Sequence, residues 1–88
     1  MADVWRDRIH ILAHILDCAE NLFGATQSDL MDRTELGWRQ LKRYLTFLEG
    51  RGLINQSPSK RWWTTWRGGQ FLQNYLILRM LLEEECKS

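Results

Sequence analysis

Residues 36–45 read Leu-Gly-Trp-Arg-Gln-Leu-Lys-Arg-Tyr-Leu, a run that places three basic residues among regularly spaced apolar ones. The apolar residues of this run, continued by Leu48, recur every three or four positions, which predicts an amphipathic helix. We expect the helix to begin near Trp38 and to end at Gly50. At about 100° per residue, its polar and basic side chains lie on the side away from the apolar ones. Arg39, Arg43 and Thr46 lie nearly opposite the apolar face, and Gln40 and Lys42 lie on the shoulders of this polar side.

Two further helices are predicted before this run. Residues 3–22 show the same helical period, and Gly24 follows as a left-handed helix stop. Thr26 and Asp29 have the spacing of an N-terminal capping pair, which predicts a short helix over residues 27–33. In the connection to the next helix, we expect Leu36 to fill the corner and Gly37 to adopt an unusual backbone conformation.

Behind the run the pattern changes from helical to extended. Residues 53–56 and 62–65 are rich in strand-forming residues, and the turn-forming segment 57–61 separates them, which predicts a two-stranded hairpin. Thr65 is a suitable cap for a last helix, which contains no breaker from Phe71 to about Cys86. The predicted fold class is therefore mainly α with a small β-hairpin.

The charges of the chain are unevenly distributed. With 88 residues, 44% hydrophobic and 26% charged, the composition is typical of one small globular domain, and the net charge is only +1. Residues 1–37 contain three basic and seven acidic side chains, whereas residues 38–69 contain seven basic and one acidic. The positive excess lies on the helix near 38–50 and at the hairpin tip, where Lys60 and Arg61 have no expected role in folding.

This distribution predicts binding to duplex DNA. Arg and Gln side chains hydrogen-bond to guanine and adenine edges in the major groove, while Lys and the remaining Arg neutralise phosphates. The alternative is a protein-interaction module whose basic face meets an acidic partner without any direct DNA readout. Measuring duplex binding at two salt concentrations distinguishes the two hypotheses.

The order of elements and several short motifs resemble the winged helix-turn-helix family, and in particular its small archaeal members. The motifs are the run at 36–45 with Leu48, Gly52-Leu53-Ile54, and Thr65-Trp66-Arg67-Gly68. The resemblance implies a homodimeric DNA-binding protein, either a transcriptional regulator or an architectural chromatin protein, with a recognition helix at about 38–50 in the major groove. It also implies a wing at about 57–62 on the DNA backbone or in the minor groove. Two departures are Gly37, where a capping Ser is common, and Trp62-Trp63, where one Tyr is usual.

The last helix is apolar around most of its circumference. Phe71, Tyr75, Leu78 and Leu82 have coiled-coil spacing, but their neighbours are apolar too, so one face cannot hold them all. A second copy of the chain is the expected cover. We therefore divide the chain into a DNA-binding domain, residues 1–68, and a dimerisation helix, residues 69–88, packed on the same domain.

Other chemistry receives little support from the sequence. His10, His14 and Asp17 share a helix face, but ordinary surface positions explain them better than a metal site does. Trp62, Trp63 and Trp66 either stack on bases or cover the core, and we favour the core. Catalytic constellations, cofactor motifs and small-molecule sites are not evident, so we predict a protein that is not an enzyme. Two distant cysteines and the absence of a long apolar segment favour a cytoplasmic, nucleoid-associated protein without membrane spans.

Overall fold

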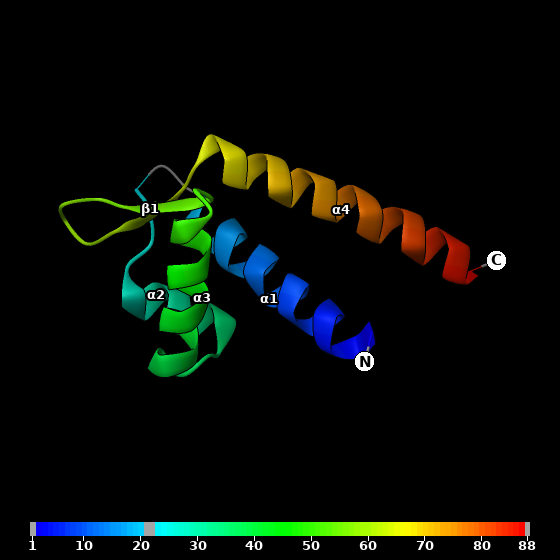
Figure 1. Ribbon diagram of the computed structural model, residues 1–88, viewed down its shortest axis with the longest axis horizontal. Helices are drawn as coiled ribbons and strands as arrows, with labels where there is room; N and C mark the ends of the chain where they lie inside the picture. The colour runs from blue at the N-terminus through cyan, green and yellow to red at the C-terminus, as the bar shows by residue number, and fades with distance from the viewer. Residues whose placement is uncertain (1, 21–22, 88) are drawn as a thin grey trace.

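The computed structural model describes residues 2–20 and 23–87, with side chains for residues 8–20 and 23–82. Within these ranges the chain forms four helices and one small antiparallel sheet, which confirms the predicted fold class (Figure 1). In chain order the elements are α1 (Ala2–Ala19), α2 (Gln27–Thr34), α3 (Trp38–Gly50), β1 (Ile54–Gln56), β2 (Trp62–Thr64) and α4 (Trp66–Lys87).

The core lies where α1, α2 and α3 meet the hairpin. Leu41, Leu45 and Leu48 are almost completely buried, so the predicted apolar face of α3 is the face that packs inward. The other apolar side chains of the core come from every neighbouring element. They include Ile15 and Leu16 of α1, Leu30 of α2, Ile54 of β1 and Trp62 of β2.

The beginning of α2 matches the prediction, whereas the end of α1 does not. The Oγ1 atom of Thr26 accepts a hydrogen bond from the Asp29 backbone N–H, and the Asp29 carboxylate accepts one from the Thr26 N–H, both at 3.2 Å. The bond from the Thr26 backbone holds the pKa of the Asp29 carboxyl below its ordinary value. Helix α1, expected over residues 3–22, ends at Ala19. Residues 21 and 22 lie outside the described residues, and Gly24 does not directly follow the helix.

The connection between α2 and α3 corrects one expectation. The left-handed residue of this turn is Glu35, with φ 57°, because its N–H closes the end of α2 by bonding to the Met31 carbonyl at 2.9 Å. Gly37 has an ordinary extended conformation, with φ −69° and ψ 159°, and it is the N-cap residue of α3. Leu36 packs against the core as predicted.

The hairpin is larger than its two strands suggest. Strands β1 and β2 pair in register, with Asn55 opposite Trp63. Ala25, in the loop before α2, forms an additional antiparallel bridge to Trp62, with backbone hydrogen bonds of 2.8 and 2.9 Å. Gly24 permits this contact, since its φ is +72° and a Cβ there would lie 2.9 Å from the Trp63 ring. The sequence did not indicate this bridge.

Helix α4 begins directly after the hairpin. Thr65 caps it as predicted: its Oγ1 accepts a hydrogen bond from the Gly68 N–H at 3.0 Å and donates one to the Gly52 carbonyl at 2.7 Å. Along the chain, α4 diverges from α1, so its C-terminal half extends away from the rest of the molecule (Figure 1). Among the described residues, none of the helices combines the length and apolarity needed to cross a membrane.

Candidate nucleic-acid interface

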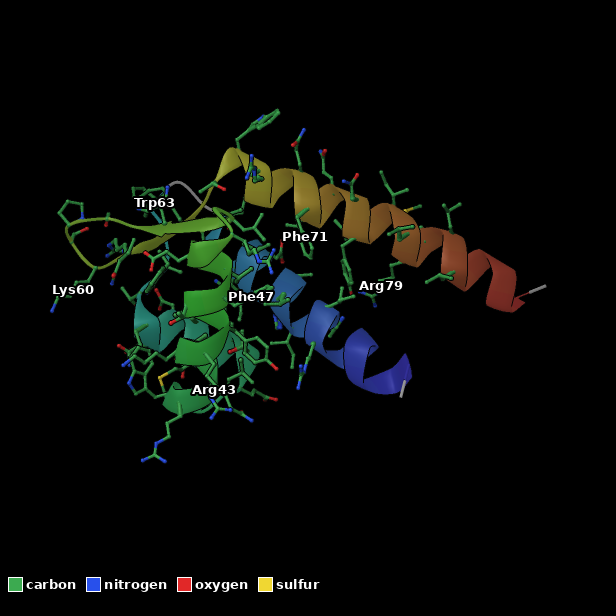
Figure 2. The ribbon with its side chains drawn as sticks, in the orientation of Figure 1. Arg43, Phe47, Lys60, Trp63, Phe71 and Arg79 are labelled. Carbon is green, nitrogen blue, oxygen red and sulfur yellow. The ribbon has the colours of Figure 1, made fainter. Side chains whose placement is uncertain are left out.

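The outward face of α3 is basic and exposed. Burial of the three core leucines sets the rotation of the helix, and the side chains on the opposite side are consequently held in solvent. Arg39, Lys42, Arg43 and Thr46 together line an open depression of about 440 Å³. Gln40, the fifth predicted contact residue on α3, is exposed but does not line it. Figure 2 shows Arg43 in the half of α3 that lies farther from α4.

The electrostatic character of this depression follows from its lining. Three of its four described residues are basic side chains, and the fourth carries a hydroxyl that donates or accepts hydrogen bonds. Among residues 8–20 and 23–82, whose side chains the structure describes, no carboxylate lines it. Such a surface favours a polyanion that also offers hydrogen-bond acceptors, which are the properties of a duplex groove and its phosphates.

Lys60 lies at the tip of the hairpin and is exposed (Figure 2). The tip is closed by hydrogen bonds from the Ser57 N–H to the Arg61 carbonyl at 2.8 Å and from the Lys60 N–H to the Ser57 carbonyl at 2.9 Å. This tight turn forces Lys60 to a φ of 64°, a conformation that a residue with a Cβ adopts only at a cost.

Arg61 differs from Lys60, and the expectation that neither has a role in folding was wrong for Arg61. Its side chain is half-buried, and its Nη1 donates a hydrogen bond to the Phe23 carbonyl at 3.3 Å. This contact joins residues 38 positions apart in the sequence. Only the folding of the loop before α2 against the hairpin creates it, so no local pattern could have indicated it.

A second depression, of about 270 Å³, separates the hairpin from the first turns of α2 and α3. Lys60 and Gln56 contribute to it from the hairpin, and Ser28 and Trp38 contribute from the helices. It resembles the α3 face in chemistry, because the described residues of its lining combine hydroxyl, amide and ammonium groups with indole rings and include no carboxylate. Both depressions therefore favour an anionic, hydrogen-bonding partner.

The three tryptophans at the end of the hairpin have different surroundings. Trp62 is 9% exposed and belongs to the core, as favoured from the sequence, and Trp63 is half-buried beside Gly24. Trp66 is 80% exposed, so core packing does not explain it. The expectation of core packing is therefore confirmed for Trp62 and wrong for Trp66.

The predicted dimer residues of α4 are not equivalent. Phe71 and Tyr75 are half-buried, with Phe71 packed on the core and the Tyr75 hydroxyl 2.6 Å from Nδ1 of His10 on α1. Leu78 and Leu82 are 60% and 56% exposed. Leu72, outside the predicted set, is the buried large apolar residue in the described part of this helix. The remaining large exposed apolar side chains are Leu76, Ile77, Met80 and Leu81.

The other titratable groups offer little chemistry. Among the described residues, no three His, Cys, Asp or Glu side chains gather closely enough to hold a metal ion. Cys18 is buried in the core, and burial raises the pKa of its thiol, an effect that Arg33 partly opposes. The side chain of Cys86 lies outside the described residues.

Three helices, a hairpin after the third, and an exposed basic face on that third helix define a helix-turn-helix protein with a wing. The winged helix-turn-helix family matches residues 5–83, and the chain belongs to this family. Domains of the family are typically DNA-binding and not catalytic. No curated protein matches the sequence closely enough to identify a relative.

Proposed function

We propose that this protein binds duplex DNA as a homodimer and acts as a transcriptional regulator or an architectural chromatin protein in the nucleoid of an archaeal cell. The observation that carries the proposal is the basic depression on α3, which Arg39, Lys42 and Arg43 line together. In this arrangement α3 enters the major groove, and the wing at residues 57–62 contacts the backbone or the minor groove.

The contacts divide into two kinds. Arg39, Arg43 and Gln40 are long, exposed side chains on a rigid helix, which suits bidentate hydrogen bonds to base edges. Lys42 and Lys60 are better suited to phosphates, because an ammonium is a flexible point charge. Thr46 is short and suits a contact with a base or a phosphate close to the helix. Arg61 contributes less to DNA binding, since its guanidinium already donates a hydrogen bond to the Phe23 carbonyl.

Duplex binding by single-alanine variants tests the α3 assignment. Arg39→Ala and Arg43→Ala are each expected to weaken binding to the preferred sequence by about 1–3 kcal/mol. Arg8→Ala is the matched control, because Arg8 is an exposed arginine of α1 with the same charge. Equal effects of all three variants would indicate attraction by overall charge only. Unchanged affinity of the α3 variants would favour the protein-interaction alternative.

The dimer is supported by the uncovered apolar surface of α4. We divide the chain into residues 1–68, which bind DNA, and residues 69–88, which pair with a second copy while packing on their own domain. Leu78 and Leu82 are more than half exposed, whereas Phe71 and Tyr75 join the helix to its own core. Pairing presents two α3 helices to one duplex and doubles the phosphate contacts of a chain whose net charge is only +1.

A further inference from the structure

The most exposed aromatic side chain among the described residues is Trp66, the first residue of α4. Its indole is 80% exposed, although a tryptophan normally covers apolar surface when the fold offers it. Trp66 belongs neither to the core nor to the proposed duplex-binding face of α3. A second large aromatic side chain, Phe47 of α3, is 47% exposed.

Two arginines belong to the same two segments of the chain, the end of α3 and the start of α4. The guanidinium carbon of Arg51 is 5.2 Å from the centroid of the Phe47 ring, a cation–π contact. Arg67 follows Trp66, and its Nη1 atom lies 4.0 Å from the position that a Cβ would take on Gly52. Both arginines are exposed.

The backbone holds this group in place. The Thr65 N–H donates to the Leu53 carbonyl at 3.1 Å, and the Thr65 hydroxyl donates to the Gly52 carbonyl at 2.7 Å. The first turn of α4 is thereby joined to the turn between α3 and β1, as Figure 1 shows. The backbone thus brings two separate segments together, and we call their exposed aromatic and basic residues the α4-start surface: Phe47, Arg51, Trp66 and Arg67.

Phe47 borders the proposed duplex-binding face, since it lies one helical turn from Arg43, but the other residues of the α4-start surface lie beyond the end of α3. Arg39 and Arg51 are at opposite ends of α3, about 18 Å apart along the helix axis. Lys60 is at the tip of the hairpin, whereas α4 starts from the other end of β2 (Figure 2). A duplex lying along Arg39 and Arg43 therefore need not cover the indole of Trp66.

We propose that the α4-start surface is a second nucleic-acid site and that it binds a single-stranded segment. An unpaired base exposes its flat face for stacking on Trp66, and the two guanidiniums pair with the flanking phosphates. A duplex is a poorer occupant, because its base faces are already stacked. An acidic peptide matches the arginines but leaves the exposed indole without a role.

Binding of a fluorescent oligothymidylate of about 12 nucleotides tests the proposal, with anisotropy as the readout. Trp66→Ala is expected to weaken binding about tenfold. Arg51→Ala with Arg67→Ala should reduce the salt dependence of log K by about 0.7 for each phosphate that is no longer neutralised. The fold is not at risk, because all three side chains are exposed. Phe23→Ala is the control, because Phe23 is an exposed aromatic residue outside the α4-start surface, and this variant should bind normally.

A reciprocal experiment separates this site from the duplex-binding face. Arg39→Ala with Arg43→Ala should weaken duplex binding and leave oligothymidylate binding intact. Trp66→Ala should weaken oligothymidylate binding and leave duplex binding intact. Normal oligothymidylate binding by Trp66→Ala overturns the proposal, as does the absence of binding by the unaltered protein. If polyglutamate displaces the labelled oligonucleotide as well as unlabelled oligothymidylate does, the proposal is also overturned, in favour of an acidic protein partner. If the unaltered protein binds oligothymidylate but not duplex DNA, only the proposed function is refuted.

Discussion

Gly68 and Gly69 are adjacent in α4, but only Gly68 has a structural reason to be glycine. A Cβ on Gly68 would overlap the Leu53 carbonyl oxygen, and a Cβ on Gly69 would meet no atom within 4 Å. We expect Gly68→Ala to lower the free energy of unfolding by about 1–3 kcal/mol, because the start of α4 must move away from β1. Gly69→Ala should raise it by about 0.5–1 kcal/mol through better helix propensity.

Urea denaturation of the two variants checks this pair, each serving as the other's control. The two substitutions add the same methyl group one residue apart, so composition cannot explain opposite signs. If Gly68→Ala were as stable as the unaltered protein, the close approach of α4 to the α3–β1 turn would be incorrect.

Lys60 has a backbone conformation that lowers stability, and its side chain is proposed to contact a DNA phosphate. Its φ of 64° is unfavourable for a residue with a Cβ, and glycine has no such penalty. We expect Lys60→Gly to raise the free energy of unfolding by about 1 kcal/mol. The same change should reduce the slope of log K for duplex DNA against log salt by about 0.9 for each phosphate that is no longer neutralised.

Thermal unfolding and duplex titrations at several salt concentrations measure the two effects separately. Lys60→Asn is the control, because asparagine tolerates the left-handed region but lacks the charge. A lower stability of Lys60→Gly would contradict the strained tip, and an unchanged salt slope would remove Lys60 from the phosphate contacts.

At the scale of the element, α3 lacks a side-chain cap at the end that carries Arg39. Gly37 occupies the N-cap position with extended backbone, makes no side-chain hydrogen bond, and leaves the space around a Cβ open within 4 Å. Gly37→Ser should therefore stabilise the protein by about 0.5–1 kcal/mol, since the hydroxyl satisfies a free N–H and serine restricts the unfolded chain.

Equilibrium urea unfolding measures this gain, and Gly37→Ala identifies its source. Alanine also restricts the unfolded chain but offers no cap, so it should be less stable than Gly37→Ser. Equal stabilities for the serine and alanine variants would show that the new hydroxyl makes no cap.

At the scale of the whole molecule, the proposed dimer depends on the exposed half of α4. Leu78 is 60% exposed, so a glutamate there is compatible with the fold of one chain but not with an apolar helix pair. We expect Leu78→Glu to be monomeric and to bind duplex DNA weakly, because each monomer brings only one α3.

Sedimentation equilibrium at micromolar concentration measures the mass of both proteins. Gln73→Glu is the control, since it adds the same charge at an exposed polar position of α4. A monomeric mass for the unaltered protein, with duplex binding intact, would refute the dimer.

Much of the fold and part of the candidate site follow from local sequence. The helical period placed Leu41, Leu45 and Leu48 inside, and the same rotation exposed Arg39 and Arg43. The caps at Thr26 and Thr65 were equally predictable, because each joins residues three positions apart. Such features involve neighbours within one helical turn, so the amino-acid order alone determines them.

Only the tertiary structure decided the rest. Three features depend on contacts between segments far apart in the chain. They are the hydrogen bond from Arg61 to Phe23, the bridge between Ala25 and Trp62, and the close approach of Gly68 to Leu53. The exposure of Trp66 also depends on tertiary packing, since the helical period does not predict which side of a helix a neighbouring element covers. By itself the sequence determined the elements and the inward face of α3, because local backbone geometry repeats. Which residues remain for binding depended on how those elements pack, because burial is a property of surfaces that distant segments share.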